Sequence, residues 1–179
     1  SDLGLTFNGT DQYMTFPDDQ DLYDWSVGKS FSFEVWCQSL EMQNELQVIM
    51  GRETVGSTHW WIGTQSLTGN AAFFLYDAGQ NGGGLFGTTN INDGKWHHIA
   101  AVYDMKVFRC YVDGKVDGET PIDNLKPDTA ETPVTIGSWI GKSATHSGGA
   151  LGNLLYGTGR HATCHERTRR YNRKGSCRL

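Results

Sequence analysis

Apolar and polar side chains alternate along several short stretches of the chain. In FSFEVWCQ, Phe31–Gln38, apolar residues occupy the odd positions. The even positions hold Ser32, Glu34, Trp36 and Gln38. This period of two is typical of a β-strand that turns one side to a core and the other to solvent.

Runs rich in β-branched and aromatic residues recur between Gly, Asn and Asp turns. Further strands are predicted at Thr58–Thr64, Ala71–Asp77, Trp96–Asp104, Val107–Gly114, Pro133–Trp139 and Ala150–Tyr156. Tight turns are predicted at Met105-Lys106 and Asp113-Gly114. One possible helix, His161–Arg173, lacks an apolar stripe. About eight or more short strands with almost no helix predict an all-β fold of two antiparallel sheets packed face to face.

Length and composition fit one soluble domain. The chain has 179 residues, of which 37% are hydrophobic and 20% charged, so it is neither disordered nor membrane-embedded. Its longest apolar run, Ala71–Tyr76, is far too short to span a bilayer, and no membrane insertion is expected. We expect a sandwich domain at residues 1–156 and a basic tail at 157–179.

Charge is unevenly distributed between these two parts. Residues 151–179 hold 7 of the 15 basic side chains and 1 of the 20 acidic ones. The first 150 residues therefore carry 8 basic and 19 acidic groups, a balance of −11. An acidic body repels phosphate backbones, so no nucleic-acid partner is expected. The tail is predicted to dock on the acidic body, to bind an outside anion or to stay loose.

The four cysteines form no C-x-x-C pair, which argues against a zinc or redox motif. Cys37 and Cys110 share the core-facing parity of their strands and are predicted to be buried free thiols. Cys164 and Cys177 lie together in the tail and would close a short loop in an oxidising compartment.

Several motifs, in sequence order, resemble laminin-G-like domains of the concanavalin A-like lectin/glucanase superfamily, in its laminin-G/pentraxin-like branch. They are LTFNGTDQYMTFP (Leu5–Pro17), FSFEVW (Phe31–Trp36), DGKWHHIAAVYD (Asp93–Asp104) followed by YVDGK (Tyr111–Lys115), and TIGSW (Thr135–Trp139). The resemblance covers roughly Leu3–Tyr156. It implies a two-sheet jelly roll, and it implies less about function, because these motifs are mostly core and turns.

The sequence departs from these relatives at two places. Many of them carry an Asp-Glu pair in the closing strand, where this chain has Gly152 and Asn153, so a calcium site that used such a carboxylate is in doubt. Pentraxins link the two strands that correspond to Phe31–Gln38 and Trp96–Asp104 by a disulfide. Here Ala100 stands at the second position, so that bridge is absent.

No catalytic site is predicted. Glucanases of this fold carry Glu-x-Asp-x-x-Glu on one strand, with the two carboxyl groups close enough for a retaining mechanism. Glu41 and Glu45 have no Asp between them, Glu34 stands alone on its strand, and no Gly-x-Ser-x-Gly elbow occurs. His97 and His98 are neighbours on a strand and point to opposite faces, so they cannot share a metal ion.

A structural Ca²⁺ is the one cofactor that the sequence suggests. Calcium needs six to eight oxygen ligands, and the densest carboxylate cluster is Asp18, Asp19, Asp21 and Asp24. Asp11 in the first turn is a second candidate, since relatives often hold an ion near that edge. The alternative is a solvated acidic loop.

The adjacent Trp60 and Trp61 are the leading candidates for a binding platform. On one strand, one ring faces the core and the other faces outward. An exposed indole is a flat apolar surface on which the C–H face of a sugar can stack. Polar groups for the sugar hydroxyls would come from Tyr76, Asp77, Gln80 and Asn81, beside a flexible Gly82–Gly84 loop. Trp139 and Trp25 are further candidates, and the alternative is that these rings only pack within the sandwich.

The function expected from these observations is a secreted or cell-surface, non-catalytic, carbohydrate-binding module. Its partner would be a glycan or glycoprotein, held by Trp stacking and loop hydrogen bonds. The alternative is a protein-binding adhesion or structural domain, which the same fold also serves. A glycan hydrolase or lyase would need a pair of catalytic side chains that the sequence does not place.

Overall fold

The computed structural model describes residues 4–7, 12–16, 30–39, 46–54, 57–77, 79, 81–123, 125, 132–137 and 153–155. The predicted helix at 161–173, the tail at 157–179 and the tail cysteines lie outside the described residues. The domain boundary at residue 156 therefore stays a prediction.

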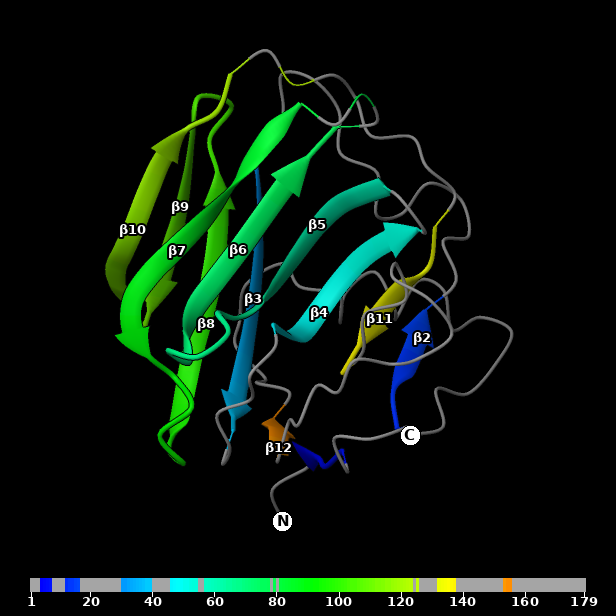
Figure 1. The fold of residues 1–179 in the computed structure, drawn as a ribbon, viewed down its shortest axis with the longest axis vertical. Coiled ribbons are helices and arrows are strands. Elements are labelled where there is room, and N and C mark those ends of the chain that lie inside the picture. The colour runs from blue at the N-terminus through cyan, green and yellow to red at the C-terminus, as the bar shows by residue number, and fades with distance from the viewer. Residues whose placement is uncertain are drawn as a thin grey trace, which may run out of the picture.

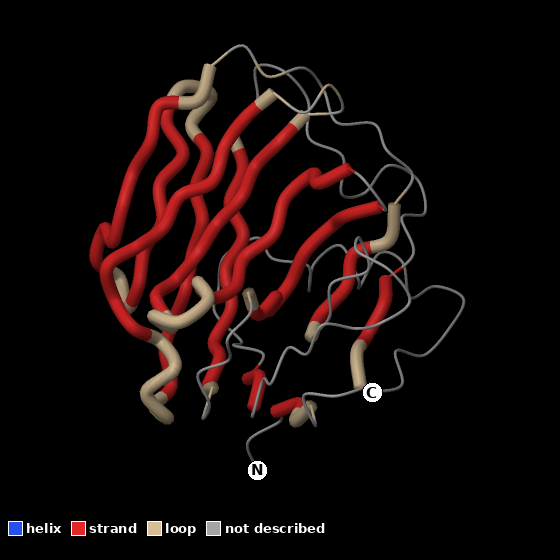
Figure 2. Tube along the Cα trace, viewed as in Figure 1, coloured by secondary structure: helices blue, strands red, loops and turns tan. Residues whose placement is uncertain are grey.

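The described strands form two six-stranded sheets that pack face to face (Figures 1 and 2). The back sheet has the order β1 (Gly4–Leu5), β12 (Asn153–Leu155), β3 (Phe31–Gln38), β8 (Trp96–Tyr103), β9 (Val107–Val112), β10 (Lys115–Pro121). The front sheet has the order β2 (Met14–Phe16), β11 (Val134–Ile136), β4 (Gln47–Thr54), β5 (Ser57–Thr64), β6 (Asn70–Tyr76), β7 (Gly82–Asn90). Every neighbouring pair is antiparallel, which confirms the predicted two-sheet sandwich. None of the described segments is a helix that could cross a membrane.

The triple glycine is a strand rather than the expected flexible loop. Gly82–Gly84 open β7 and pair with the end of β6. Gly82 has a φ of 140°, and a Cβ there would lie 2.1 Å from the carbonyl oxygen of Leu75. The segment therefore needs glycine for a close backbone approach, and period-two patterning could not reveal it, because glycine has no side chain to alternate.

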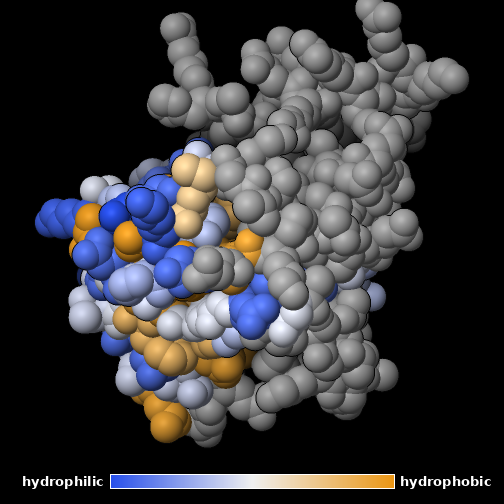
Figure 3. Space-filling model, turned by 90° about the horizontal axis from the view of Figure 1, so that it is seen from above, coloured by the Kyte–Doolittle hydropathy of each residue, from blue (hydrophilic) through white to orange (hydrophobic). Residues whose placement is uncertain are grey.

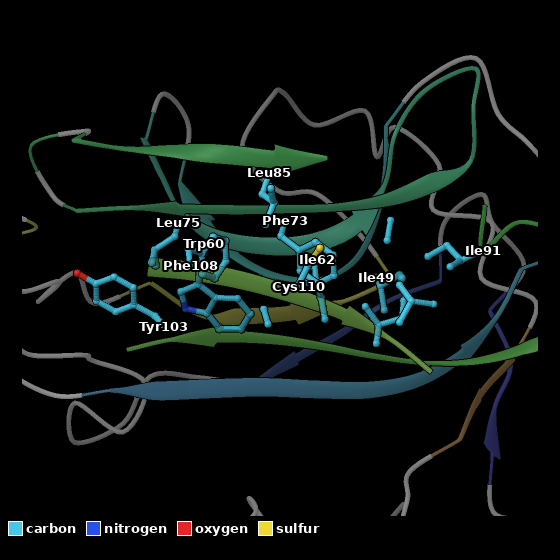
Figure 4. Packing of buried hydrophobic residues seen from close by; sticks show 14 of the residues in the cluster. Ile49, Trp60, Ile62, Phe73, Leu75, Leu85, Ile91, Tyr103, Phe108 and Cys110 are labelled. Carbon is cyan, nitrogen blue, oxygen red and sulfur yellow. The ribbon is translucent and has the colours of Figure 1, made fainter. Parts of the chain in front are cut away.

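The core lies between the sheets, as the alternation predicts. Phe33 of β3 stacks on Trp60 of β5, with ring centroids 4.1 Å apart and planes 16° apart. Figure 4 shows Trp60 enclosed between the layers, with Phe73 and Phe108 nearby. This burial removes large aromatic areas from water, which is the main favourable term in folding.

The expectation that one of the two adjacent indoles is exposed is wrong. Trp61 does point away from the main core, but only 3% of its surface is accessible. Its ring stacks on Phe74 of β6 at 4.3 Å between centroids, and a Cβ at Gly63 would lie 3.1 Å from the ring. Because Gly51 and Gly63 on that face have no side chains, the indole lies down on the sheet and forms a second apolar cluster with Val48, Ala72, Leu46 and Phe74.

Cys37 and Cys110 are buried free thiols, as their strand parity predicts. Burial raises the pKa of each thiol to about 12, with a smaller contribution from Asp113 for Cys37 and from Asp117 for Cys110. Because the thiolate is the reactive form, both side chains act as small apolar core residues.

One carboxylate joins the edges of the two sheets. Asp117 of β10 accepts hydrogen bonds from the backbone N–H and the hydroxyl groups of Thr88 and Thr89 of β7. A Cβ at Gly87 would lie only 1.8 Å from Asp117 Oδ2, so glycine is needed for this approach. The contact covers part of β7, an edge strand whose open N–H groups would otherwise be available to another chain.

His97 is held between two carboxylates at one end of β8. Its Nδ1 lies 2.9 Å from Asp113 Oδ2 and its Nε2 lies 3.0 Å from Asp93 Oδ1. Only the protonated ring donates from both nitrogens. Partial burial lowers the pKa of His97, but the hydrogen bonds to the two carboxylates outweigh it, and the net pKa is raised. His97 thereby ties the β7–β8 loop to the β9–β10 turn.

Replacing Trp61 with alanine should destabilise the fold. Because the indole is buried, Trp61→Ala is expected to lower the free energy of unfolding by about 3–5 kcal/mol, measured by urea denaturation. Phe86→Ala is the matched control, since that ring is 47% exposed and should cost about 1 kcal/mol or less. Equal losses in the two variants would contradict the burial of Trp61.

The His97 clamp should make stability depend on pH in a defined window. The raised pKa of His97 means that its contribution is complete below about pH 6.5 and lost as the pH rises through the folded-state value. The pKa of Asp93 is lowered by hydrogen bonds from Lys95 and His97. Burial raises the pKa of Asp113. Hydrogen bonds from His97 and from the backbone N–H of His98 outweigh burial, so the net pKa of Asp113 is lowered. The stabilisation from Asp93 and Asp113 is therefore present above about pH 4 and is lost as the pH falls through their lowered pKa values.

Thermal unfolding across this range is the measurement. The clamp stabilises most between about pH 4 and 6.5, so the melting temperature of the wild type should decrease from about pH 6 to pH 8. His97→Gln should flatten that decrease, whereas His98→Gln, on the opposite face, should keep it. An unchanged slope in His97→Gln would show that the clamp does not titrate in this range.

Candidate functional site

The residues proposed from sequence do not form an exposed platform. Trp60 lies in the main core and Trp61 is covered on the front sheet. Asp77 is buried, and its Oδ1 accepts hydrogen bonds from the N–H of Gly79 at 2.7 Å and of Asn81 at 2.9 Å. The Asn81 side-chain amide donates to the same carboxylate, so both residues shape the β6–β7 connection. Among the described members of the set, Tyr76 shares a surface with the covered indole, through Phe74.

The remaining predicted residues fall elsewhere. Gln80, Trp139, Trp25 and the calcium candidates Asp11, Asp18, Asp19, Asp21 and Asp24 lie outside the described residues. Within the described ranges, no group of three or more His, Cys, Asp or Glu side chains could hold a metal ion. The calcium site stays a prediction.

The exposed indole of the described chain is Trp36, which the sequence analysis did not name as a site. It stands on the outward side of β3, and 42% of its surface is accessible. Phe33 and Val35, with the opposite parity, pack against the core. The signal was present in the alternation, which already placed Trp36 and Glu34 in the solvent row of this strand.

Strand register assembles a polar and aromatic surface around Trp36, and we call this surface the Trp36 face. It consists of Glu34, Trp36, His98, Ala100 and Tyr111. Trp36 pairs with His98 of β8, and their rings lie 5.2 Å apart with a tilt of 48°. Glu34 pairs with Ala100, which in turn pairs with Tyr111 of β9. The small Ala100 side chain therefore lies between a carboxylate on one side and a phenol on the other.

His98 links the aromatic and acidic members of the face. Its Nε2 lies 3.6 Å from Glu34 Oε2, just beyond a hydrogen bond, while its ring contacts Trp36. His97 points the other way into its carboxylate clamp. The predicted opposite directions of the two histidine rings are thus confirmed.

Arg109 is already paired on the same side of the back sheet. Its Nε donates to Glu119 Oε2 at 3.0 Å, and its Nη1 donates to Asp104. The hydrogen bond from Arg109, with backbone N–H groups, holds the pKa of Asp104 at about 2, so this carboxylate stays ionised. The pairing fixes the edge of the face beyond Tyr111.

The opposite side of the molecule carries a different surface. Phe74 contacts Phe86 of β7 edge-on at 5.6 Å and lies near Tyr76 at 6.2 Å, and the Phe74 ring covers Gly84. Seen from above, hydrophobic side chains gather along the lower margin of the described surface, which corresponds to the front of Figure 1 (Figure 3). This surface offers apolar contact, whereas the Trp36 face combines a ring with hydrogen-bonding groups.

Solved structures with the same architecture include several domains of larger proteins. Domains LG4-5 of the mouse laminin alpha1 chain superpose with a TM-score of 0.61 and 15% identity, covering 85% of this chain and 40% of that one. The receptor binding domain of botulinum neurotoxin D gives 0.58 and 13%, covering 85% and 39%. CBM40 of the Ruminococcus gnavus IT-sialidase gives 0.57 and 10%, covering 73% and 76%. At these identities the likeness shows the fold alone.

The chain spans about two fifths of the laminin and toxin chains that it matches. No curated protein sequence matches it. The family model described as "Concanavalin A-like lectin/glucanases superfamily", a laminin-G model, matches residues 8–154. That match covers most of the chain and includes the β3, β8 and β9 motifs, and the fold agrees with it. The chain therefore belongs to the concanavalin A-like lectin/glucanase superfamily as a laminin-G-like jelly-roll domain.

Proposed function

We propose that this chain is a secreted or cell-surface, non-catalytic, carbohydrate-binding module, and that the Trp36 face holds the glycan. The observation that carries the proposal is the exposed indole of Trp36, set on a rigid sheet beside polar side chains. A pyranose ring presents an apolar C–H face, which stacks on an indole, and hydroxyl groups at its rim.

Glu34, His98 and Tyr111 provide donors and acceptors around the space above Ala100. Because these groups stand on three paired strands, their positions are set by backbone hydrogen bonds rather than by a loop. A rigid site lowers the entropy lost on binding. Among the solved structures of this fold, the receptor binding domain of botulinum neurotoxin D and CBM40 of the IT-sialidase support a binding role over a catalytic one.

Trp36→Ala should remove glycan binding without unfolding the protein. Loss of a stacking platform is expected to weaken affinity at least about tenfold, measured on a glycan array and by calorimetry with the best ligand. The exposed position predicts a change in unfolding free energy of about 1 kcal/mol or less. Phe86→Ala, on the opposite surface, is the control and should bind as the wild type does.

Two outcomes would contradict the proposal. Full binding by Trp36→Ala together with loss in Phe86→Ala would place the glycan on the front sheet. A blank array for the wild type would favour the second candidate function, a protein-binding adhesion domain. The observation that favours this second candidate is the apolar surface around Phe74 and Phe86, where the exposed Phe86 ring packs edge-on against a second ring.

A further inference from the structure

Glu34 is the solvent-exposed carboxyl group of the Trp36 face. Its side chain is 49% exposed, and in the described part of the chain its one ion-pair neighbour is His98, at 3.6 Å. At that distance the two groups do not form a hydrogen bond, so the carboxylate oxygens keep acceptor capacity toward solvent. A ligand on Trp36 therefore meets a carboxyl group two residues away on the same side of β3.

Arg109, the cation that the described strands place on this side of the sheet, is already paired with other carboxylates. Arg109 donates to both Glu119 and Asp104, which leaves two carboxylates sharing one guanidinium. Lys95 is paired with Asp93 in the β7–β8 loop. No Arg or Lys of the described chain forms an ion pair with Glu34, so the described region next to Trp36 has acidic rather than basic character.

An indole beside a free carboxylate is a site for a positively charged nitrogen. Tryptophan is the best aromatic partner for an ammonium group, which is attracted to the negative face of the ring. A carboxylate adds charge-assisted hydrogen bonds, which are about twice as strong as neutral ones. A neutral sugar can stack on the ring and form hydrogen bonds through its hydroxyl groups, whereas a charged amino sugar adds charge attraction to both the ring and the carboxylate.

The charge of the whole domain acts in the same direction. The first 150 residues carry a formal balance of −11, from 8 basic and 19 acidic side chains. The full chain keeps a net charge of −5, because residues 151–179 contribute +6. Such a field attracts cationic ligands and repels sugars with carboxylate or sulfate groups. An acidic glycan on Trp36 would also set a second negative charge near Glu34, with no described cation between them.

We infer that the Trp36 face selects glycans that carry a positively charged amino group, such as oligomers of glucosamine, over their N-acetylated and acidic counterparts. This inference rests on the proposed function. Trp36 stacks against the sugar ring, and Glu34 receives the ammonium group. His98 lies beside both residues, with its ring against Trp36 and its Nε2 3.6 Å from Glu34 Oε2.

The test compares four ligands on the full chain at neutral pH. Three of them are a glucosamine oligomer, the N-acetylglucosamine oligomer of the same length, and sialyllactose. An N-trimethylated glucosamine oligomer serves as a permanently charged form of the first. We expect the wild type to bind both charged oligomers about tenfold tighter than the acetylated one, and sialyllactose most weakly.

Glu34→Gln separates the charge from the shape of the site. This variant should bind the charged and the acetylated oligomers with nearly equal affinity, because the ring remains and the charge is gone. Glu119→Gln is the matched control: it removes a carboxylate from the same side of the sheet, 60% exposed but already paired with Arg109, and should keep the wild-type preference. Added salt should reduce the preference in the wild type but not in Glu34→Gln.

Three results would overturn the inference while leaving a carbohydrate-binding function intact. They are equal binding of charged and acetylated oligomers by the wild type, an unchanged preference in Glu34→Gln, and tighter binding of sialyllactose. Failure to bind any glycan would overturn the proposed function itself.

Discussion

The antiparallel pairing of β3 with β8 is the constraint on which both the core and the candidate site depend. It sets Val35 opposite Ile99, inside the sandwich, and Trp36 opposite His98, outside it. A shift of this register by one residue would move the core side chains to solvent and bury the indole. Burial of the apolar side chains of β3 and β8 therefore fixes the register, and the register fixes the positions of the side chains on the outer face.

The size of the neighbouring residues decides whether the ring of an outward-facing tryptophan is exposed. Trp61 has glycines beside it on its own strand and on β4, so the indole lies flat and Phe74 covers it. Trp36 has a histidine ring opposite it, which supports the indole at a tilt and leaves much of it accessible. Parity assigns the side of a sheet, and the size of the cross-strand neighbours then assigns the exposure.

This difference between parity and neighbour size explains which features could be predicted from the sequence. Alternation was sufficient for β3, β8 and β9, for the opposite directions of His97 and His98, and for the burial of Cys37 and Cys110. It could not reveal β7, because glycines show no alternation, nor which of the outward-facing tryptophans would be covered. That answer depends on which residues of β4, β6, β8 and β12 pair with each tryptophan, and the register between two strands cannot be predicted from either strand alone.

The two outer surfaces differ in chemistry because their strands differ in what they place beside an aromatic ring. On the front sheet, Phe74 and Phe86 neighbour glycines and each other. That surface therefore offers apolar contact area but little hydrogen bonding to orient a partner. On the back sheet, His98 lies against the indole and Glu34 lies beside His98, so under the proposed function a ligand there would be oriented as well as held. Apolar area favours many partners to a similar extent, whereas a ring with a fixed charge beside it distinguishes between ligands of the same shape. The back sheet is therefore the side on which this domain can be selective.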